Sequence, residues 1–205
     1  MFSALCGYLL GAETPLIYDV LLLVIGGLFV TGSANAFNQI IEKEEDKLMR
    51  RTQTRPLPSK KLSSFQSLIF AFSIGIIGLY FLFLINIQCS FFGLLSLLVY
   101  VVLYTPLKKV SPIAIFVGAL PGAIPCLLGW VAATDDFGLA AGILFAIQFF
   151  WQFPHFIAIS LIFADPEINS PRSAVVTVAA VINDITSHLI CEVQTQMLGH
   201  HSSNF

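Results

Sequence analysis

The chain has 205 residues, of which 57% are hydrophobic and 11% are charged, and its formal net charge is −2. Soluble domains carry roughly 25% charged residues. The composition therefore excludes an ordinary soluble globular domain and indicates a membrane protein.

Apolar stretches of membrane-spanning length recur along the chain. A hydrocarbon core about 30 Å thick needs roughly 20 apolar residues in a helix. Five stretches meet this length, at residues 16 to 41, 64 to 86, 89 to 105, 112 to 133 and 138 to 164. Residues 1 to 11 cover about half a bilayer and lack the features of a signal peptide. We therefore expect an all-α, multi-pass transmembrane helical bundle with five full spans and a partial first helix.

Basic residues are confined to alternate connections between these spans. Seven of the ten Lys and Arg residues lie between the first and second full spans, and Lys108 and Lys109 lie in the next loop on the same side. The connections GAETP, NIQCS and TDDFG on the opposite side contain none. The positive-inside rule places the basic side in the cytoplasm of a bacterium or the matrix of a mitochondrion. The expected location is a bacterial cytoplasmic or mitochondrial inner membrane.

The stretch NQIIEKEEDKLMRRTQTRPLP, residues 38 to 58, concentrates charge directly after an apolar span. Residues 42 to 61 hold eleven charged side chains, and burying them at about 2.5 to 3.5 kcal/mol each excludes this segment from the bilayer core. Steps of four place Asn38, Glu42 and Asp46 on one helix face. Their oxygen donors suit Mg²⁺.

Arg50, Arg51 and Arg55 follow this acidic face, and guanidinium groups match phosphate oxygens. The spacing is consistent with a site for a metal-bridged diphosphate, or with an ordinary positive-inside loop whose acids compensate its charge. His155 in WQFPHF is the second polar residue to stand out. A lone His in a span indicates either a functional site or a helix-to-helix hydrogen bond.

Three longer stretches bear a family resemblance. They are ANAFNQIIEKEEDKLMRRTQTRPLPS at 34 to 59, YTPLKKVSPIAIFVGALPGAIPCLLGW at 104 to 130, and FFWQFPHFIAISL at 149 to 161. In content, order and separation they resemble heme O synthases (protoheme IX farnesyltransferases), which are intramembrane prenyltransferases of the UbiA-type superfamily with nine spans. The resemblance extends from Met1 to about Asp165.

The resemblance implies roles for individual residues. It implies catalytic roles for Asn38, Glu42, Asp46 and His155, with Asn38, Glu42, Asp46 and Asp165 as ligands of Mg²⁺. It also implies that the diphosphate is held by Arg51, Arg55, Lys108 and Lys109. Glu42 stands where many members have Asp, and its longer side chain offers the same donors with a different reach.

The implied reaction transfers a farnesyl group from farnesyl diphosphate to a vinyl group of heme b and forms heme O. The implied partners are these two substrates and the lipid bilayer, with heme-biosynthesis or terminal-oxidase assembly proteins as candidate protein partners and no nucleic acid. Two alternatives stay open from the sequence. One is a UbiA-type prenyltransferase acting on a quinone precursor, and the other is a non-catalytic or truncated membrane protein.

The chain departs from the family pattern after Asp165. We expect an incomplete prenyltransferase membrane domain over residues 1 to 165 and a poorly ordered tail over 166 to 205. Asp165 is then the remnant of a second acidic motif whose other residues are absent. The hypothesis is a truncated or frame-shifted reading of a longer gene, with weak or no catalysis by these 205 residues alone.

Overall fold

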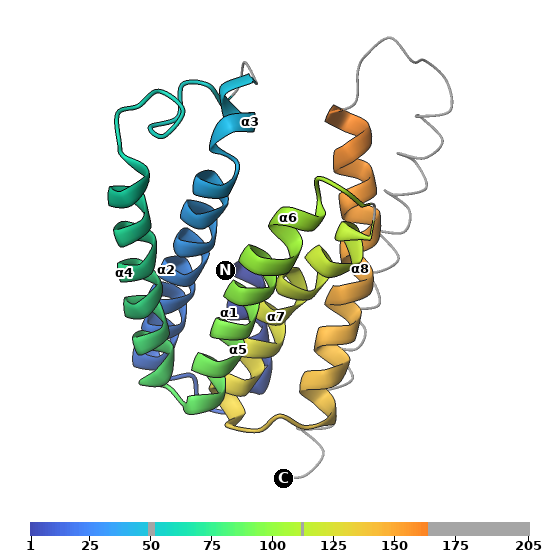
Figure 1. Cartoon of the computed structure of the whole chain (residues 1–205). Helices are drawn as coiled ribbons and strands as arrows, with labels where there is room; N and C mark the ends of the chain where they lie inside the picture. Colours follow the sequence, from blue (N-terminus) through green and yellow to red (C-terminus); the bar gives the residue numbers. More distant parts are fainter. Residues whose placement is uncertain (49–51, 112, 164–205) are drawn as a thin grey trace.

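The computed structural model describes residues 1–48, 52–111 and 113–163, so the predicted tail lies outside the described residues. Within them the chain forms helices and no strand. In chain order these are α1 (Phe2–Gly11), α2 (Ile17–Ile41), α3 (Lys43–Leu48), α4 (Ser64–Phe83), α5 (Ile87–Leu98), the π-helix η1 (Val99–Tyr104), α6 (Thr105–Leu107), α7 (Ala114–Thr134) and α8 (Leu139–Phe163). Figure 1 shows a bundle with α2 and α4 at one edge and α8 at the other.

The predicted spans agree closely with the observed helices. Four helical segments in the described ranges are long and apolar enough to cross a membrane: α2, α4, the continuous segment Ile87–Leu107, and α7. The fifth predicted span coincides with α8, and the predicted partial helix coincides with α1, which has ten residues. The all-α, multi-pass membrane fold is thus confirmed.

The loops that carry basic residues and the loops without Lys or Arg lie at opposite ends of the bundle (Figure 1). Helix α3 and the loop over residues 52 to 63, which carry most of the basic residues, lie at one end together with the α6–α7 connection. The connections without Lys or Arg lie at the other end. This arrangement is the one that the alternation of basic loops predicts for successive membrane crossings.

Close helix pairs hold the bundle together, above all α2 with α4 and α1 with α7. Glycine allows the backbones to approach at both contacts. A Cβ added at Gly78 of α4 would lie 2.8 Å from the Gly26 carbonyl oxygen of α2. A Cβ added at Gly129 of α7 would overlap the carbonyl oxygen of Ala4 in α1. Small residues let helices pack in this way where lipid offers no hydrophobic driving force between them.

Replacing Gly129 with Val is expected to separate α1 from α7, because the new side chain meets backbone that cannot move aside. Overpacking of this kind costs about 1 to 3 kcal/mol of the free energy of unfolding. Denaturant unfolding of the detergent-solubilised chain measures it. Gly142→Ala is the control, because no atom lies within 4 Å of the added Cβ. Equal stability of the two variants would contradict close backbone packing between α1 and α7.

The third span changes its helical type partway along. Val99–Tyr104 is π-helical and leads directly into α6. Pro106 has no backbone N–H to donate to the preceding turn, and the Thr105 hydroxyl donates to the Tyr100 carbonyl at 2.8 Å. Short π segments within α-helices frequently mark functional sites. This one carries the span to the end of the bundle where the charged loops lie.

Candidate functional site

The candidate site begins where α2 ends. Glu42 caps this helix with φ −97° and ψ 11°, and α3 starts at the next residue. The Asn38 side-chain amide donates from Nδ2 to Glu42 Oε2 at 2.9 Å. The spacing of four therefore does bring these two side chains together, as expected for neighbours on one helix face.

Lys108, at the end of α6, contacts both Asn38 and Glu42. Its Nζ lies 2.8 Å from Glu42 Oε1 and donates to Asn38 Oδ1 at 3.1 Å. The Thr105 hydroxyl also approaches Asn38 Oδ1, at 3.3 Å. With two donors on Oδ1 and a carboxylate on Nδ2, the orientation of the Asn38 amide is determined by its surroundings. We call Asn38, Glu42, Thr105 and Lys108 the polar cluster.

Asp46 lies one helical turn beyond Glu42, and its backbone N–H donates to the Glu42 carbonyl at 2.8 Å. It is 4% exposed, and its Oδ2 accepts a hydrogen bond from Arg55 Nη1 at 2.8 Å. The buried Thr52 hydroxyl donates to the Asp46 backbone carbonyl at 2.9 Å. These contacts attach α3 to the following loop. Asp46 thus has Arg55 as its ion-pair partner, as Glu42 has Lys108.

Two further acids of α3 also form ion pairs. Glu45 pairs with Lys109, which lies just after the third span, and Glu44 pairs with Lys47 at 2.7 Å within α3. The hydrogen bond from Lys109 lowers the pKa of Glu45 below its ordinary value. The Glu45–Lys109 contact thus contributes stability above the unfolded-state pKa of Glu45, and this contribution is lost as pH falls through the lowered pKa.

The contacts pair two of the predicted metal ligands with predicted diphosphate-binding residues. Glu42 holds Lys108 and Asp46 holds Arg55. The acidic and basic side chains thus neutralise one another at this end of the bundle. If a metal ion and a diphosphate bound here, the metal would take the carboxylates and the phosphate oxygens would take the cations. The present ion pairs would then be replaced.

The donor chemistry of the polar cluster fits a hard cation. Lys108 Nζ lies between an amide oxygen and a carboxylate oxygen, so the structure already brings these two oxygens together around a positive charge. No group of three or more His, Cys, Asp and Glu side chains converges in the described ranges. Mg²⁺ often takes only one or two protein carboxylates and completes its shell with water and phosphate oxygens. Asn38 and Glu42 meet that requirement.

A cavity of about 300 Å³ lies inside the bundle next to the polar cluster, between α2, the third span and α7, and it is partly open to the surroundings. Asn35 lines it one helical turn before Asn38, and Tyr100 lines it from the π-helix. The Tyr100 carbonyl accepts the Thr105 hydroxyl, which links the cavity wall to the cluster. Most of the rest of its lining is apolar, including Gly118, Pro121, Gly122 and Pro125 of α7.

Three predicted site residues remain. His155 lies in α8, and its ring stacks on Trp151 with centroids 4.8 Å apart. Arg51 and Asp165 lie outside the described residues. Their assigned roles stay predictions.

Thr105 is a site residue that sequence reasoning missed. Its side chain is fully buried, and its hydroxyl approaches both the Tyr100 carbonyl and Asn38 Oδ1. The only signal was its place in the quoted stretch YTPLKK, next to Tyr104 and three residues before Lys108. A Thr at the end of an apolar span has many structural uses, so the contact with Asn38 becomes evident only in three dimensions.

Replacing Thr105 with Val is expected to remove one of the two donors to Asn38 Oδ1 and the side-chain donor to the Tyr100 carbonyl, which keeps the Thr105 backbone N–H. The expected cost is about 0.5 to 1.5 kcal/mol of unfolding free energy, and the affinity for Mg²⁺ with diphosphate falls severalfold because Asn38 loses one of the contacts that orient it. Isothermal titration of the detergent-solubilised chain measures the affinity. Thr105→Ser keeps the hydroxyl and should restore binding. Unchanged binding in the Val variant would contradict the positioning role.

Membrane-spanning helices that carry a carboxylate, amide and ammonium cluster beside an internal cavity define an integral membrane protein with a polar site at one end of its bundle. The sequence profile of the UbiA prenyltransferase family matches residues 1–189. The chain belongs to the UbiA prenyltransferase family.

Curated relatives share extended sequence with this chain. It is 53% identical over 162 residues to the protoheme IX farnesyltransferase of Flavobacterium psychrophilum, a match that covers 78% of this chain and 54% of the relative. It is 47% identical over 161 residues to the protein of the same name from Cytophaga hutchinsonii, covering 78% and 56%. The chain thus spans about half the length of the curated relatives it matches.

Solved structures share the fold. A UbiA homolog from Aeropyrum pernix K1 superposes with a TM-score of 0.76 over 94% of this chain and 77% of that one, at 18% identity. A digeranylgeranylglyceryl phosphate synthase gives a TM-score of 0.69 over 94% of this chain and 72% of that one, at 22% identity. At these identities the comparison establishes the arrangement of helices.

Proposed function

We propose that the chain carries the metal and diphosphate site of a heme O synthase, which transfers the farnesyl group of farnesyl diphosphate to a vinyl group of heme b. The observation that carries this proposal is the polar cluster, in which one lysine holds the oxygens of Asn38 and Glu42. The names of the curated relatives support the choice of farnesyl diphosphate and heme over a quinone precursor.

In this proposal Asn38, Glu42 and Asp46 would hold Mg²⁺, and the ion would supply positive charge to the diphosphate oxygens. Lys108 leaves Glu42 and turns its ammonium to the leaving diphosphate, and Lys109 does the same from Glu45. Arg55, now paired with Asp46, is proposed as a third cation that contacts the diphosphate, and Arg51 is proposed as a fourth. Cleavage of the allylic C–O bond places negative charge on the diphosphate, and preorganised cations stabilise that charge.

The cavity beside the cluster is proposed to receive the isoprenoid chain. Its walls come from residues within the membrane spans. A mostly apolar lining within the membrane keeps water from the allylic cation that develops as the diphosphate departs. His155 is proposed to line the heme side of the pocket, and the basic loop is proposed to face the cytoplasm or matrix.

Product analysis tests this function. Membranes that contain the full chain, and membranes that contain the chain joined to the C-terminal segment of the Flavobacterium psychrophilum relative, are supplied with heme b, farnesyl diphosphate and Mg²⁺. Chromatography with mass spectrometry should detect heme O in at least the joined protein. Glu42→Gln and Asp46→Asn should abolish it. Absence of heme O from both proteins, or product that survives both substitutions, would contradict the proposal.

A further inference from the structure

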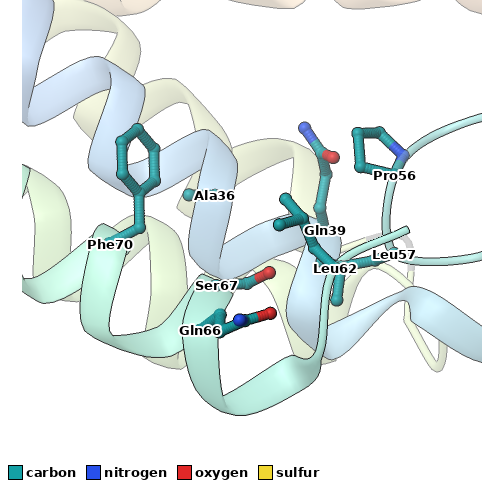
Figure 2. Close-up of a pocket in the computed structure, with 8 residues that line it drawn as sticks. All are labelled: Ala36, Gln39, Pro56, Leu57, Leu62, Gln66, Ser67 and Phe70. Carbon is teal, nitrogen blue, oxygen red and sulfur yellow. The ribbon is translucent and has the colours of Figure 1, made fainter. Parts of the chain in front are cut away.

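A second cavity lies on the outer side of the bundle and has no place in the proposed reaction. It measures about 290 Å³ and is bounded by α2, the start of α4 and the loop between them (Figure 2). It shares no lining residue with the internal cavity beside the polar cluster. We call it the loop groove, and its walls include Ala36, Gln39, Leu57, Leu62, Ser67 and Phe70.

The loop over residues 52 to 63 folds back to close one side of the loop groove. Leu57 is 4% exposed, and Figure 2 shows it beside Leu62. The Lys61 and Leu62 amides both donate to the Pro56 carbonyl, at 2.9 and 3.2 Å. Lys60 and Lys61 therefore occupy the turn between two apolar wall residues, and both are exposed.

These two lysines leave a surplus of positive charge at the loop groove. The four acids of residues 42 to 46 are each paired elsewhere, with Lys108, Lys47, Lys109 and Arg55. In the described part of the chain neither Lys60 nor Lys61 has an ion pair. Lys43 adds a third cation, and its Nζ donates to Ser64 Oγ at the start of α4 at 3.0 Å. A ligand here should carry negative charge.

The apolar wall of the loop groove continues into the outer face of α4. Phe65, Ile69 and Phe70 are 70%, 51% and 59% exposed. Because α4 is one of the membrane-spanning segments, such side chains face the hydrocarbon of the bilayer. An apolar groove that opens toward lipid on one side and has lysines at its rim suits a molecule with an apolar chain and an anionic head group.

We propose that the loop groove binds an anionic phospholipid. Its head group lies at Lys60 and Lys61, and one acyl chain packs against Leu57, Leu62 and Phe70. Gln39 and Ser67 offer polar atoms at the depth of the glycerol esters. Pro56 and Leu57 directly follow Arg55, so the bound chain supports the segment that supplies the partner of Asp46. A lipid at this position thus stabilises the loop from the face opposite the polar cluster.

Native mass spectrometry of the delipidated, detergent-solubilised full chain tests this site, with phosphatidylglycerol and phosphatidylcholine of identical acyl chains added in equal amounts. Phosphatidylglycerol should be retained preferentially. Lys60→Gln with Lys61→Gln should lower its retention by about fivefold for each lysine. Lys47→Gln with Lys109→Gln removes the same charge from ion pairs with Glu44 and Glu45, and should change retention less than twofold. Ala36→Phe should fill the groove and remove the preference.

Several outcomes would overturn the proposal. These are equal retention of the two lipids, equal effects of the two double substitutions, or displacement of phosphatidylglycerol by glycerol phosphate, which has no acyl chain. A dimer that Ala36→Phe dissociates would show that a second copy of the chain fills the groove instead. Because no heme or farnesyl diphosphate is present, the result is independent of the proposed function.

Discussion

Replacing Glu42 with Gln is expected to weaken the Mg²⁺-dependent binding of farnesyl diphosphate by the chain at least tenfold. The substitution keeps the shape of the side chain and its contact with Asn38 but removes the charge that now holds Lys108 at 2.8 Å. Hydrogen bonds that involve a charged group are roughly twice as strong as neutral ones, and Mg²⁺ prefers carboxylate oxygens. Isothermal titration with a non-hydrolysable farnesyl thiodiphosphate measures the change.

Glu44→Gln is the matched control for this substitution. It removes the same charge two residues further on, from a side chain that is 74% exposed and pairs with Lys47 within α3. Its effect on binding should stay within about twofold, because exposed pairs contribute little. If the two variants bound equally well, the acids of this segment would merely balance the charge of the basic loop.

Replacing Asp46 with Ala is expected to have the largest effect on stability among the acids of α3. The carboxylate is buried and ion-paired, and its loss leaves Arg55 without its partner. Breaking a fully buried pair costs about 3 to 5 kcal/mol. The Arg55 side chain is 36% exposed, and water can replace part of the contact. We therefore expect a loss of about 2 kcal/mol, measured by denaturant unfolding in detergent micelles.

Glu44→Ala provides the comparison for Asp46→Ala, with an expected loss of less than about 0.5 kcal/mol. Limited proteolysis adds a second measurement. Loss of the Asp46–Arg55 pair should expose the loop over residues 52 to 63 to cleavage, since Thr52 and Arg55 both attach to Asp46. Comparable stability and cleavage in the two variants would show that the Asp46–Arg55 pair does not hold the loop to α3.

The membrane spans could be predicted because their signal is local. An apolar run of about 20 residues has one stable form in a bilayer, and α2, α4 and α7 begin and end within a few residues of the predicted limits. The π-helix in the third span could not be predicted in this way. Apolar periodicity is too coarse to distinguish α from π geometry over Val99–Tyr104. The bond from the Thr105 backbone N–H to the Tyr100 carbonyl, five residues back, is visible only in the structure.

The acidic motif shows both the strength and the limit of a spacing argument. Asn38 and Glu42 lie one turn apart, and the structure places their side chains in contact. Asp46 lies one further turn along, and its backbone N–H donates to the Glu42 carbonyl, but its side chain pairs with Arg55 of the following loop. Helical spacing predicts which residues are neighbours along one helix. It does not predict which partner from a later loop each carboxylate takes.

The partners of the acids also lay beyond the reach of the sequence. Lys108 follows Glu42 by 66 positions, and only the packing of the third span against α2 brings the two together. The resemblance to heme O synthases assigned both residues to one site without saying that they bind each other. The internal cavity and the loop groove likewise depend on how distant segments pack.

The central claim is that Asn38, Glu42 and Lys108 share one place for a metal ion and a diphosphate. Electron paramagnetic resonance of Mn²⁺, used in place of Mg²⁺, tests it in the full chain and in Lys108→Met, with and without farnesyl thiodiphosphate. Removing the lysine should strengthen the binding of Mn²⁺ alone, because Glu42 and Asn38 lose a competing cation. It should also reduce the gain in affinity that the diphosphate brings. Unchanged affinities, or changes of the same sign in both conditions, would contradict the claim.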